Sequence, residues 1–185
     1  YGSNDYSDLV RVDHDTYALA YYGYDGGGSN SWGGWIKTFT VNGGSITQVA
    51  KLRHFTSNTS FHSFIKVDAD TYALAFTDDA NDGNIKTFTI PADGSSITQV
   101  TSNEHDPNYA LYNHMVQIDH DSYVLAMYGT HTHTGTSSTG GYVRTIDTPA
   151  LATTTVPRMS SVALAAYNSP VAVTFNEAVY NTNGG

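Results

Sequence analysis

The sequence predicts an all-β protein, a β-propeller-like array of about three four-stranded antiparallel blades, with a β-sandwich or a solenoid as the alternative. The first reason is a repeat, because VDHDTYALAY at residues 12–21 returns in similar form at 67–76 and at 118–127. Self-similarity at a period near 50 residues is typical of arrays of like supersecondary units. The second reason is that short runs of β-forming residues alternate with Gly, Asn and Asp turns, the pattern of successive hairpins.

The third reason is that the second strand of each repeat is apolar on both faces. In the first repeat Tyr17, Leu19 and Tyr21 alternate with Ala18 and Ala20, so one face is bulky and the other small. A sheet with two apolar faces has to be covered on both sides. We therefore expect the large side chains of one blade to pack against the small side chains of the next.

Four strands are expected in each of the first two repeats. The first repeat covers residues 1–53, with strands at 8–12, 16–22, 35–41 and 46–52. The second repeat covers residues 54–104, with strands at 64–67, 71–77, 85–90 and 97–101. Tight turns rich in Asp, Asn and Gly separate the first strand from the second and the third from the fourth.

The third repeat covers residues 105–159 and is less regular. Strands are expected at 115–118, 122–128 and 142–147, and a degraded fourth strand near 153–156. Closed propellers have about four to eight blades. Three blades leave two apolar end faces, and we therefore expect the chain to associate with itself or with neighbouring repeats.

The motifs VDxDTYALAY, IKTFTI and SITQV together resemble a tandem repeat of very large secreted or surface-attached proteins of marine microbes. The resemblance covers about residues 1–148 and implies a propeller-like repeat region in an extracellular or cell-surface protein, without catalytic residues to carry over. The tail at 161–185 resembles the opening strands of an immunoglobulin-like surface module. The expected organisation is a repeat region at 1–159, followed at 160–185 by a linker and the first strands of that module.

Composition excludes several classes of protein. The 185 residues carry a formal net charge of −9 with only eight Lys and Arg, so no basic patch is available for nucleic acid. Cysteine is absent, which excludes thiol catalysis and thiolate metal sites. No apolar run is long enough to form a transmembrane segment.

Aromatic residues are the main candidates for binding. Between the repeated strands lie longer, divergent segments, and function usually resides in such variable loops on a rigid frame. Aromatic rings there could stack on sugar rings while Asn, Asp and Ser take the hydroxyls. The alternative is that these rings pack the loops onto the blades. The candidate ligand-binding residues are Tyr22, Tyr24, Trp32, Trp35, Tyr109, Tyr112 and Tyr128.

No cofactor is expected, although a divalent metal is an alternative. Imidazoles suit Zn, Cu or Ni, and His131, His133 and His114 are the candidate ligands, with His131 and His133 chelating if their segment is extended. The alternative is that these histidines are exposed loop residues with no shared ligand. The repeated Asp-x-Asp turns could bind calcium through carboxylates, but Asp in a turn also bonds its own backbone without an ion.

The most direct functional interpretation is a non-catalytic extracellular module for adhesion or carbohydrate binding, whose partner is a glycan or another surface. A second interpretation is a structural repeat protein that assembles head-to-tail into a filament, sheath or surface layer. A third is a fragment of a glycoside hydrolase propeller, which would use carboxylates. The carboxylates available in the divergent segments are Asp25, Asp79, Glu104 and Asp106.

Overall fold

The computed structural model describes residues 6–25, 31–118, 122–133, 136–147, 159–163 and 172–175. Every regular element in these ranges is a β-strand. The chain divides into two compact units, Tyr1–Asp147 and Thr148–Gly185. Among the described residues there is no helix with the length and apolar character needed to span a membrane.

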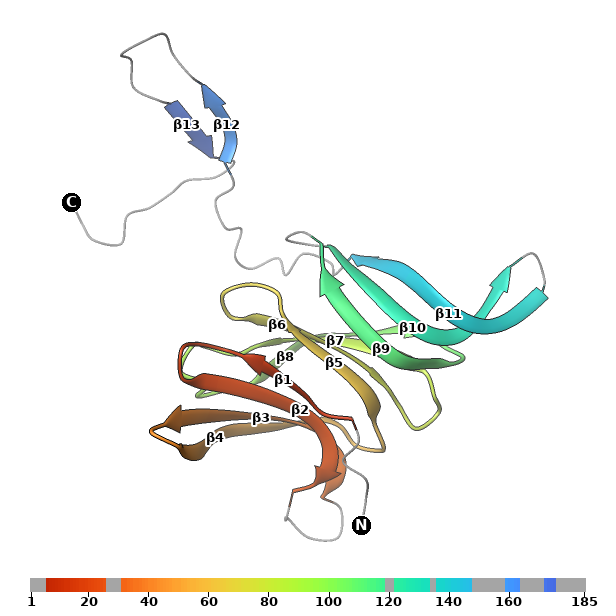
Figure 1. The fold of residues 1–185 in the computed structure, drawn as a ribbon, viewed down its shortest axis with the longest axis horizontal. Coiled ribbons are helices and arrows are strands. Elements are labelled where there is room, and N and C mark those ends of the chain that lie inside the picture. The colour runs from red at the N-terminus through yellow and green to blue at the C-terminus, as the bar shows by residue number, and fades with distance from the viewer. Residues whose placement is uncertain are drawn as a thin grey trace. The chain divides into compact units, whose positions relative to one another are not determined.

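Three antiparallel sheets make up the first unit (Figure 1). The first two sheets have four strands each, in chain order, and the third has three strands in the order β11-β10-β9. The strands of the first sheet are β1 (Asp8–Arg11), β2 (Thr16–Tyr24), β3 (Trp32–Asn42) and β4 (Ser45–Phe55). The strands of the second are β5 (Ser60–Lys66), β6 (Thr71–Thr77), β7 (Gly83–Thr89) and β8 (Thr98–Asp106). The strands of the third are β9 (Ala110–Gln117), β10 (Ser122–His133) and β11 (Thr136–Asp147).

The second unit contains a two-stranded antiparallel sheet of β12 (Met159–Ala163) and β13 (Ala172–Phe175). These strands lie in the tail for which the sequence predicts the beginning of an immunoglobulin-like module. That module stays a prediction, because the rest of the tail lies outside the described residues. The degraded fourth strand expected near 153–156 also lies outside them.

Several strands run further than the sequence predicts. β3 begins at Trp32 rather than at residue 35, and β8 continues to Asp106. β10 and β11 extend through most of the segment at 129–141, for which the sequence predicts a loop, and Gly129 pairs there with Gly140. Glycine weakens the local preference for a strand, but the ladder of hydrogen bonds between paired strands continues across it and overrides that preference.

Alternation along the second strand of each sheet has the predicted effect on packing. Ala18 and Ala20 of the first sheet are fully buried in one cluster with Tyr72, Leu74 and Phe76 of the second sheet. The large face of the second sheet therefore packs on the small face of the first, and the prediction is confirmed.

The same arrangement recurs between the second and third sheets. Ala73 and Ala75 of the second sheet are buried in a cluster with Tyr123, Leu125 and Met127 of the third. Because both of its faces are covered, every residue of β6 is buried. Dense packing of large side chains against small ones thus repeats at each junction.

The backbones of neighbouring sheets approach most closely at their first two strands. β1, β5 and β9 lie in succession side by side (Figure 1), and together with β2 and β6 they make these close approaches. Side chains of the third and fourth strands also cross the junctions. Equivalent hydrogen bonds join the first strands, since the Phe64 amide donates to Asp8 Oδ2 at 2.7 Å and the Met115 amide donates to Ser63 Oγ at 2.9 Å. The junctions are therefore repeats of one another in polar contacts as well as in apolar packing.

Candidate ligand-binding site

A row of aromatic rings crosses the sheets at the end opposite the Asp-x-Asp turns. It contains three of the predicted binding residues and two residues outside that prediction, Tyr6 and Phe61. We call this row the aromatic strip, and its members are Tyr6, Phe61, Tyr109, Tyr112 and Tyr128. Ring centroids are 4.3 Å apart for Tyr6 and Phe61 and 4.4 Å for Phe61 and Tyr112. They are 6.5 Å apart for Tyr112 and Tyr128 and 6.3 Å for Tyr109 and Tyr128.

The strip follows the repeat. Tyr6, Phe61 and Tyr112 occupy the same repeat position, each seven residues before the first aspartate of its Asp-x-Asp turn. That spacing was available in the sequence and could have identified Tyr6 and Phe61 as members of one site. Each of the three sheets therefore contributes one ring from the start of its first strand, or just before it.

Two rings of the strip are held by an uncommon backbone conformation. Phe61 has a φ of 50° and Tyr112 a φ of 55°. Both lie at register irregularities, between Ser60 and Ser63 in β5 and at the equivalent place in β9. A residue other than glycine in this left-handed region costs on the order of 1 to 2 kcal/mol. The same strained conformation recurs at equivalent positions of two repeats, so we regard it as a feature of the aromatic strip. The Tyr112 residue is 64% exposed.

Buried polar groups support the strip from beneath. The Nδ1 of His62 donates to the carbonyl oxygen of Tyr6, and its Nε2 accepts from Thr59 Oγ1 at 3.0 Å. Burial lowers the pKa of His62 to about 4, although the hydrogen bond to Tyr6 acts in the opposite direction. In the third repeat Asn113 stands in place of His62, and its Nδ2 donates to Thr77 Oγ1 at 3.0 Å.

Neutral histidines pack beside these polar groups. His54 is fully enclosed, its ring centroid lying 5.9 Å from that of His62 and 4.9 Å from that of Phe76. Burial, with the charges of His62 and Lys86, holds the pKa of His54 well below its usual range. Neither ring nitrogen of His54 has a hydrogen-bond partner among the described residues. His105 is the equivalent residue of the second repeat, and burial, together with Arg144, lowers its pKa to about 4.

Three more of the predicted residues form a separate group at the tip of the first sheet, which we call the Trp32 cluster. It consists of Tyr22, Tyr24 and Trp32, and the Trp32 ring lies 5.7 Å from Tyr22 and 5.8 Å from Tyr24, centroid to centroid. Tyr24 and Trp32 are exposed. β2 and β3 pair Tyr24 with Trp32 directly, so strand pairing holds this cluster together.

Trp35 lies apart from the Trp32 cluster. Odd and even positions of β3 face opposite sides of the sheet, so Trp35 belongs to the outer face of the first sheet. Lys51 and Arg53 lie over its ring at 5.8 and 5.9 Å from the centroid, and its Nε1 donates to the Ser31 carbonyl at 3.2 Å. Of the seven predicted residues the structure therefore places three in the strip, three in the Trp32 cluster and one elsewhere.

The predicted metal ligands occupy different stretches of the third sheet. His114 is exposed on β9 and pairs with Ala126, whereas the backbones of His131 and His133 pair with Ser138 and Thr136 in the extended β10–β11 hairpin. His131 lies five positions after Ala126 on β10, which is about 16 Å along a strand. The described residues include no group of three or more side chains able to hold a metal ion. The side chains of His131 and His133 lie outside the described set, so a metal there stays a prediction.

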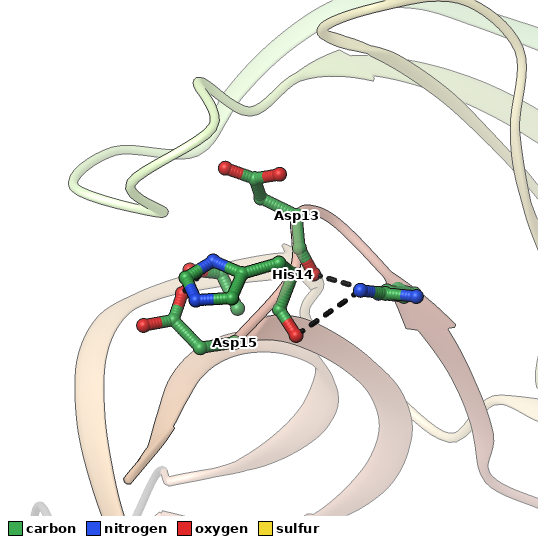
Figure 2. Close-up of polar contacts among 5 residues, drawn as sticks. Asp13, His14 and Asp15 are labelled. Carbon is green, nitrogen blue, oxygen red and sulfur yellow. Dashed lines mark hydrogen bonds and ion pairs between the residues drawn. The ribbon is translucent and has the colours of Figure 1, made fainter.

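The first two Asp-x-Asp turns are held by backbone and side-chain hydrogen bonds of the protein, and the third, at 119–121, lies outside the described residues. Figure 2 shows the turn Asp13-His14-Asp15. The Nε of Arg11 donates to the Asp13 carbonyl at 2.9 Å and its Nη2 donates to the His14 carbonyl at 3.2 Å. The amide of Val41 donates to the Asp15 carbonyl at 2.8 Å, and Ile90 bonds Asp70 in the same way. The turn is therefore a structural element of the repeat.

The four carboxylates considered for glycoside hydrolysis lie in unlike surroundings. Asp25 is nearly buried between Lys37 and Lys51. Burial acts to raise the pKa of Asp25, but hydrogen bonds and charges of the two lysines outweigh it and lower the pKa. Asp79 accepts a hydrogen bond from Ser57 Oγ at 2.6 Å, and Asp106 accepts one from the Asn108 amide at 3.1 Å. Glu104 is exposed on β8.

No model of a known protein family matches this chain, and no curated protein matches its sequence significantly. The fold defines an all-β repeat protein of face-packed antiparallel sheets. The candidate binding surfaces of this fold are the aromatic strip, the Trp32 cluster and the outer faces of the first and third sheets.

Proposed function

We propose that this protein is a non-catalytic extracellular or cell-surface module that binds carbohydrate, and that it forms part of a β-propeller-like array in a larger surface or secreted protein. The observation that carries the proposal is the aromatic strip. One aromatic ring per repeat lies at an equivalent position, and two of the rings sit on backbone with a positive φ.

The chemistry of the strip suits sugars. A pyranose presents C–H groups on its faces and hydroxyls at its edge, so it stacks on aromatic rings and needs polar groups beside them. Tyr6, Tyr112 and Tyr128 supply both a ring and a phenolic hydroxyl, and all three are exposed. A strip that runs across successive sheets suits an extended glycan better than a single monosaccharide.

The Trp32 cluster would provide a second contact at the same end of the sheets. Tyr22 and Tyr128 occupy equivalent repeat positions on their second strands, each nine residues after the first aspartate of its Asp-x-Asp turn, so the cluster and the strip belong to the same end of the fold. We infer that a glycan long enough to leave the strip reaches Tyr24 and Trp32.

The propeller-like arrangement is supported by the way the sheets meet. The backbones of neighbouring sheets approach most closely at their first two strands, as expected for blades arranged around an axis. A structural role by head-to-tail assembly is the second candidate function, and the exposed faces of the first and third sheets favour it.

Retention on immobilised polysaccharides and on a glycan array tests the binding role. Tyr112→Ala and Phe61→Ala should abolish retention, whereas Tyr112→Phe should keep it, because the second repeat already uses Phe at this position. Val143→Ala, in an exposed residue of β11 outside both aromatic groups, is the matched control. Unchanged retention by both alanine variants, with their fold intact by circular dichroism, would refute the proposal.

A further inference from the structure

Each internal junction shows what covers each face of a repeat. The first sheet supplies a small face to the second, and the second supplies a small face to the third. At both junctions the partner face consists of the large residues of the next repeat in the chain. The rule of contact is therefore small face of one repeat against large face of the next.

Polar groups repeat at these junctions as well. Lys66 Nζ donates to the Val12 carbonyl at 2.6 Å, and Gln117 Nε2, at the same repeat position, donates to the Val67 carbonyl at 3.0 Å. In both cases a side chain of the first strand reaches the carbonyl at the Asp-x-Asp turn of the preceding sheet.

A second polar contact repeats near the other end of the sheets. Lys86 Nζ donates to the His54 carbonyl at 2.5 Å, and Arg144 donates to the His105 carbonyl. Lys86 is buried and also lies over the rings of Phe55 and Phe76. At both junctions, therefore, a Lys or Arg side chain on the third strand of one sheet donates to a carbonyl near the end of the fourth strand of the preceding sheet.

The outer face of the first sheet is a large face without a covering sheet in the part of the chain that the structure describes. It contains a groove of about 430 Å³ whose lining is entirely apolar: Leu9, Tyr17, Leu19, Phe39, Val41 and Ile46. The equivalent residues of the second repeat are Phe64, Tyr72, Leu74, Phe88, Ile90 and Ile97, and all six belong to the core formed on the first sheet. Leu9 is 59% exposed, whereas its equivalent Phe64 is 3% exposed.

The outer face of the third sheet is the matching small face. Its residues are Val116, Ile118, Val124, Ala126 and Val143. The equivalent residues of the first repeat are Val10, Val12, Ala18, Ala20 and Ile36, and all five belong to the core with the second sheet. Val116 is 53% exposed. Two of the five positions keep the same residue. The other three change modestly and stay aliphatic: Ile118 stands for Val12, Val124 for Ala18 and Val143 for Ile36.

In the first sheet, the side chains equivalent to the donors that cross the internal junctions bond to groups of their own sheet. Arg11, the equivalent of Lys66, donates to the carbonyls of its own turn (Figure 2), and Lys37, the equivalent of Lys86, pairs with Asp25. Both groups lie at the edge of the open large face. They can exchange these local acceptors for the carbonyls of a covering sheet.

We propose that the large face of the first sheet binds the small face of the third sheet of a second copy of this chain, head-to-tail. Arg11 would then reach the Ile118 carbonyl of the second copy, as Lys66 reaches the Val12 carbonyl within the chain. Because the two faces are complementary and not identical, the contact closes into a ring or extends as a filament. A sheet of a preceding or following repeat is the competing occupant of either face.

Sedimentation of the full chain tests this contact. At about 100 μM an interface with a micromolar Kd is saturated, and we expect species larger than the monomer. Leu9→Glu on the large face and Val116→Glu on the small face should each give a monomer, because each places a charge in an apolar contact. Both residues are more than half exposed, so the substitutions should leave the fold intact.

Sedimentation of a mixture of Leu9→Glu and Val116→Glu is the decisive experiment. Each retains one intact face, so the mixture should form a 1:1 dimer that does not grow further. A monomeric wild type at about 100 μM, or association that survives either substitution, would overturn the proposal. Association lost in only one of the two variants would point to a symmetric contact and would also overturn it. If either variant fails to fold by circular dichroism, Ile46→Glu and Val143→Glu replace them, since both residues are still more exposed.

Discussion

The ring of Tyr112 packs against the ring of Phe61 in a tilted arrangement, 4.4 Å between centroids, although the two lie 51 positions apart in the sequence, and both residues have a positive φ. Substitutions at Tyr112 can separate the effect of the strained backbone from the effect of the aromatic ring. Glycine adopts this conformation without cost, whereas alanine keeps the strain and loses the ring. We predict that Tyr112→Gly is more stable than Tyr112→Ala by about 1 kcal/mol, as measured by chemical denaturation. Both variants should lose glycan retention, and equal stabilities would show that the backbone is not strained.

The Trp32 cluster should contribute to binding and little to stability. Trp32 and Tyr24 are exposed, so Trp32→Ala and Tyr24→Ala should change the free energy of unfolding by less than about 1 kcal/mol. Phe76→Ala, in a fully buried residue, should cost about 3 to 5 kcal/mol. Retention of long polysaccharides should fall in both cluster variants, while short oligosaccharides held by the strip should bind as before. A loss of stability comparable to that of Phe76→Ala would identify the cluster as core.

Acid should destabilise the fold through its buried histidines. Burial depresses the pKa of His54, and lowers that of His62 and His105 to about 4, whereas an unfolded histidine titrates near 6.5. Between these values the unfolded chain binds more protons than the folded one, so stability falls as the pH falls from about 6.5 toward 4. Each histidine shifted by this amount contributes on the order of 3 kcal/mol across that window.

One substitution isolates the contribution of His62. His62→Asn introduces the residue that the third repeat uses at this position, and it removes the titrating group. Urea denaturation at pH 7 and at pH 4.5 should show a smaller loss of stability in the variant than in the wild type. A variant with the same pH dependence as the wild type would contradict the assignment to His62. His14→Asn, in an exposed turn residue, is the control.

Equivalent glycines should respond differently to the same substitution. A Cβ added at Gly34 would lie 2.6 Å from the ring of His54, whereas one added at Gly141, the equivalent position of the third repeat, meets no atom within 4 Å. We predict that Gly34→Ala is destabilised by about 1 to 3 kcal/mol through overpacking and that Gly141→Ala changes the melting temperature little. Similar losses in both variants would mean that conformational preference, and not the contact with His54, decides the effect.

The outline of the strands follows from local sequence. Alternation has a period of two residues in a strand, so the faces of Tyr17 and Ala18 are fixed once the strand forms. The repeat then indicates that every sheet has one large and one small face, and the structure confirms it at both internal junctions. The ends of the strands were less predictable, because glycine-rich segments such as 129–141 lack a local preference for the strand and obtain it from pairing.

The candidate site depended on the tertiary structure. The sequence by itself determined that aromatic residues gather between the repeated strands, and its spacing places Tyr6, Phe61 and Tyr112 at one repeat position. Only the packing of the sheets decided that these rings touch, because each comes from a different sheet, and Phe61 and Tyr112 are turned by local bulges that alternation does not predict. The separation of Trp35 from Trp32 is, by contrast, a local effect, because positions 32 and 35 of one strand face opposite sides of the sheet. Residues some 50 positions apart meet instead across a junction between sheets.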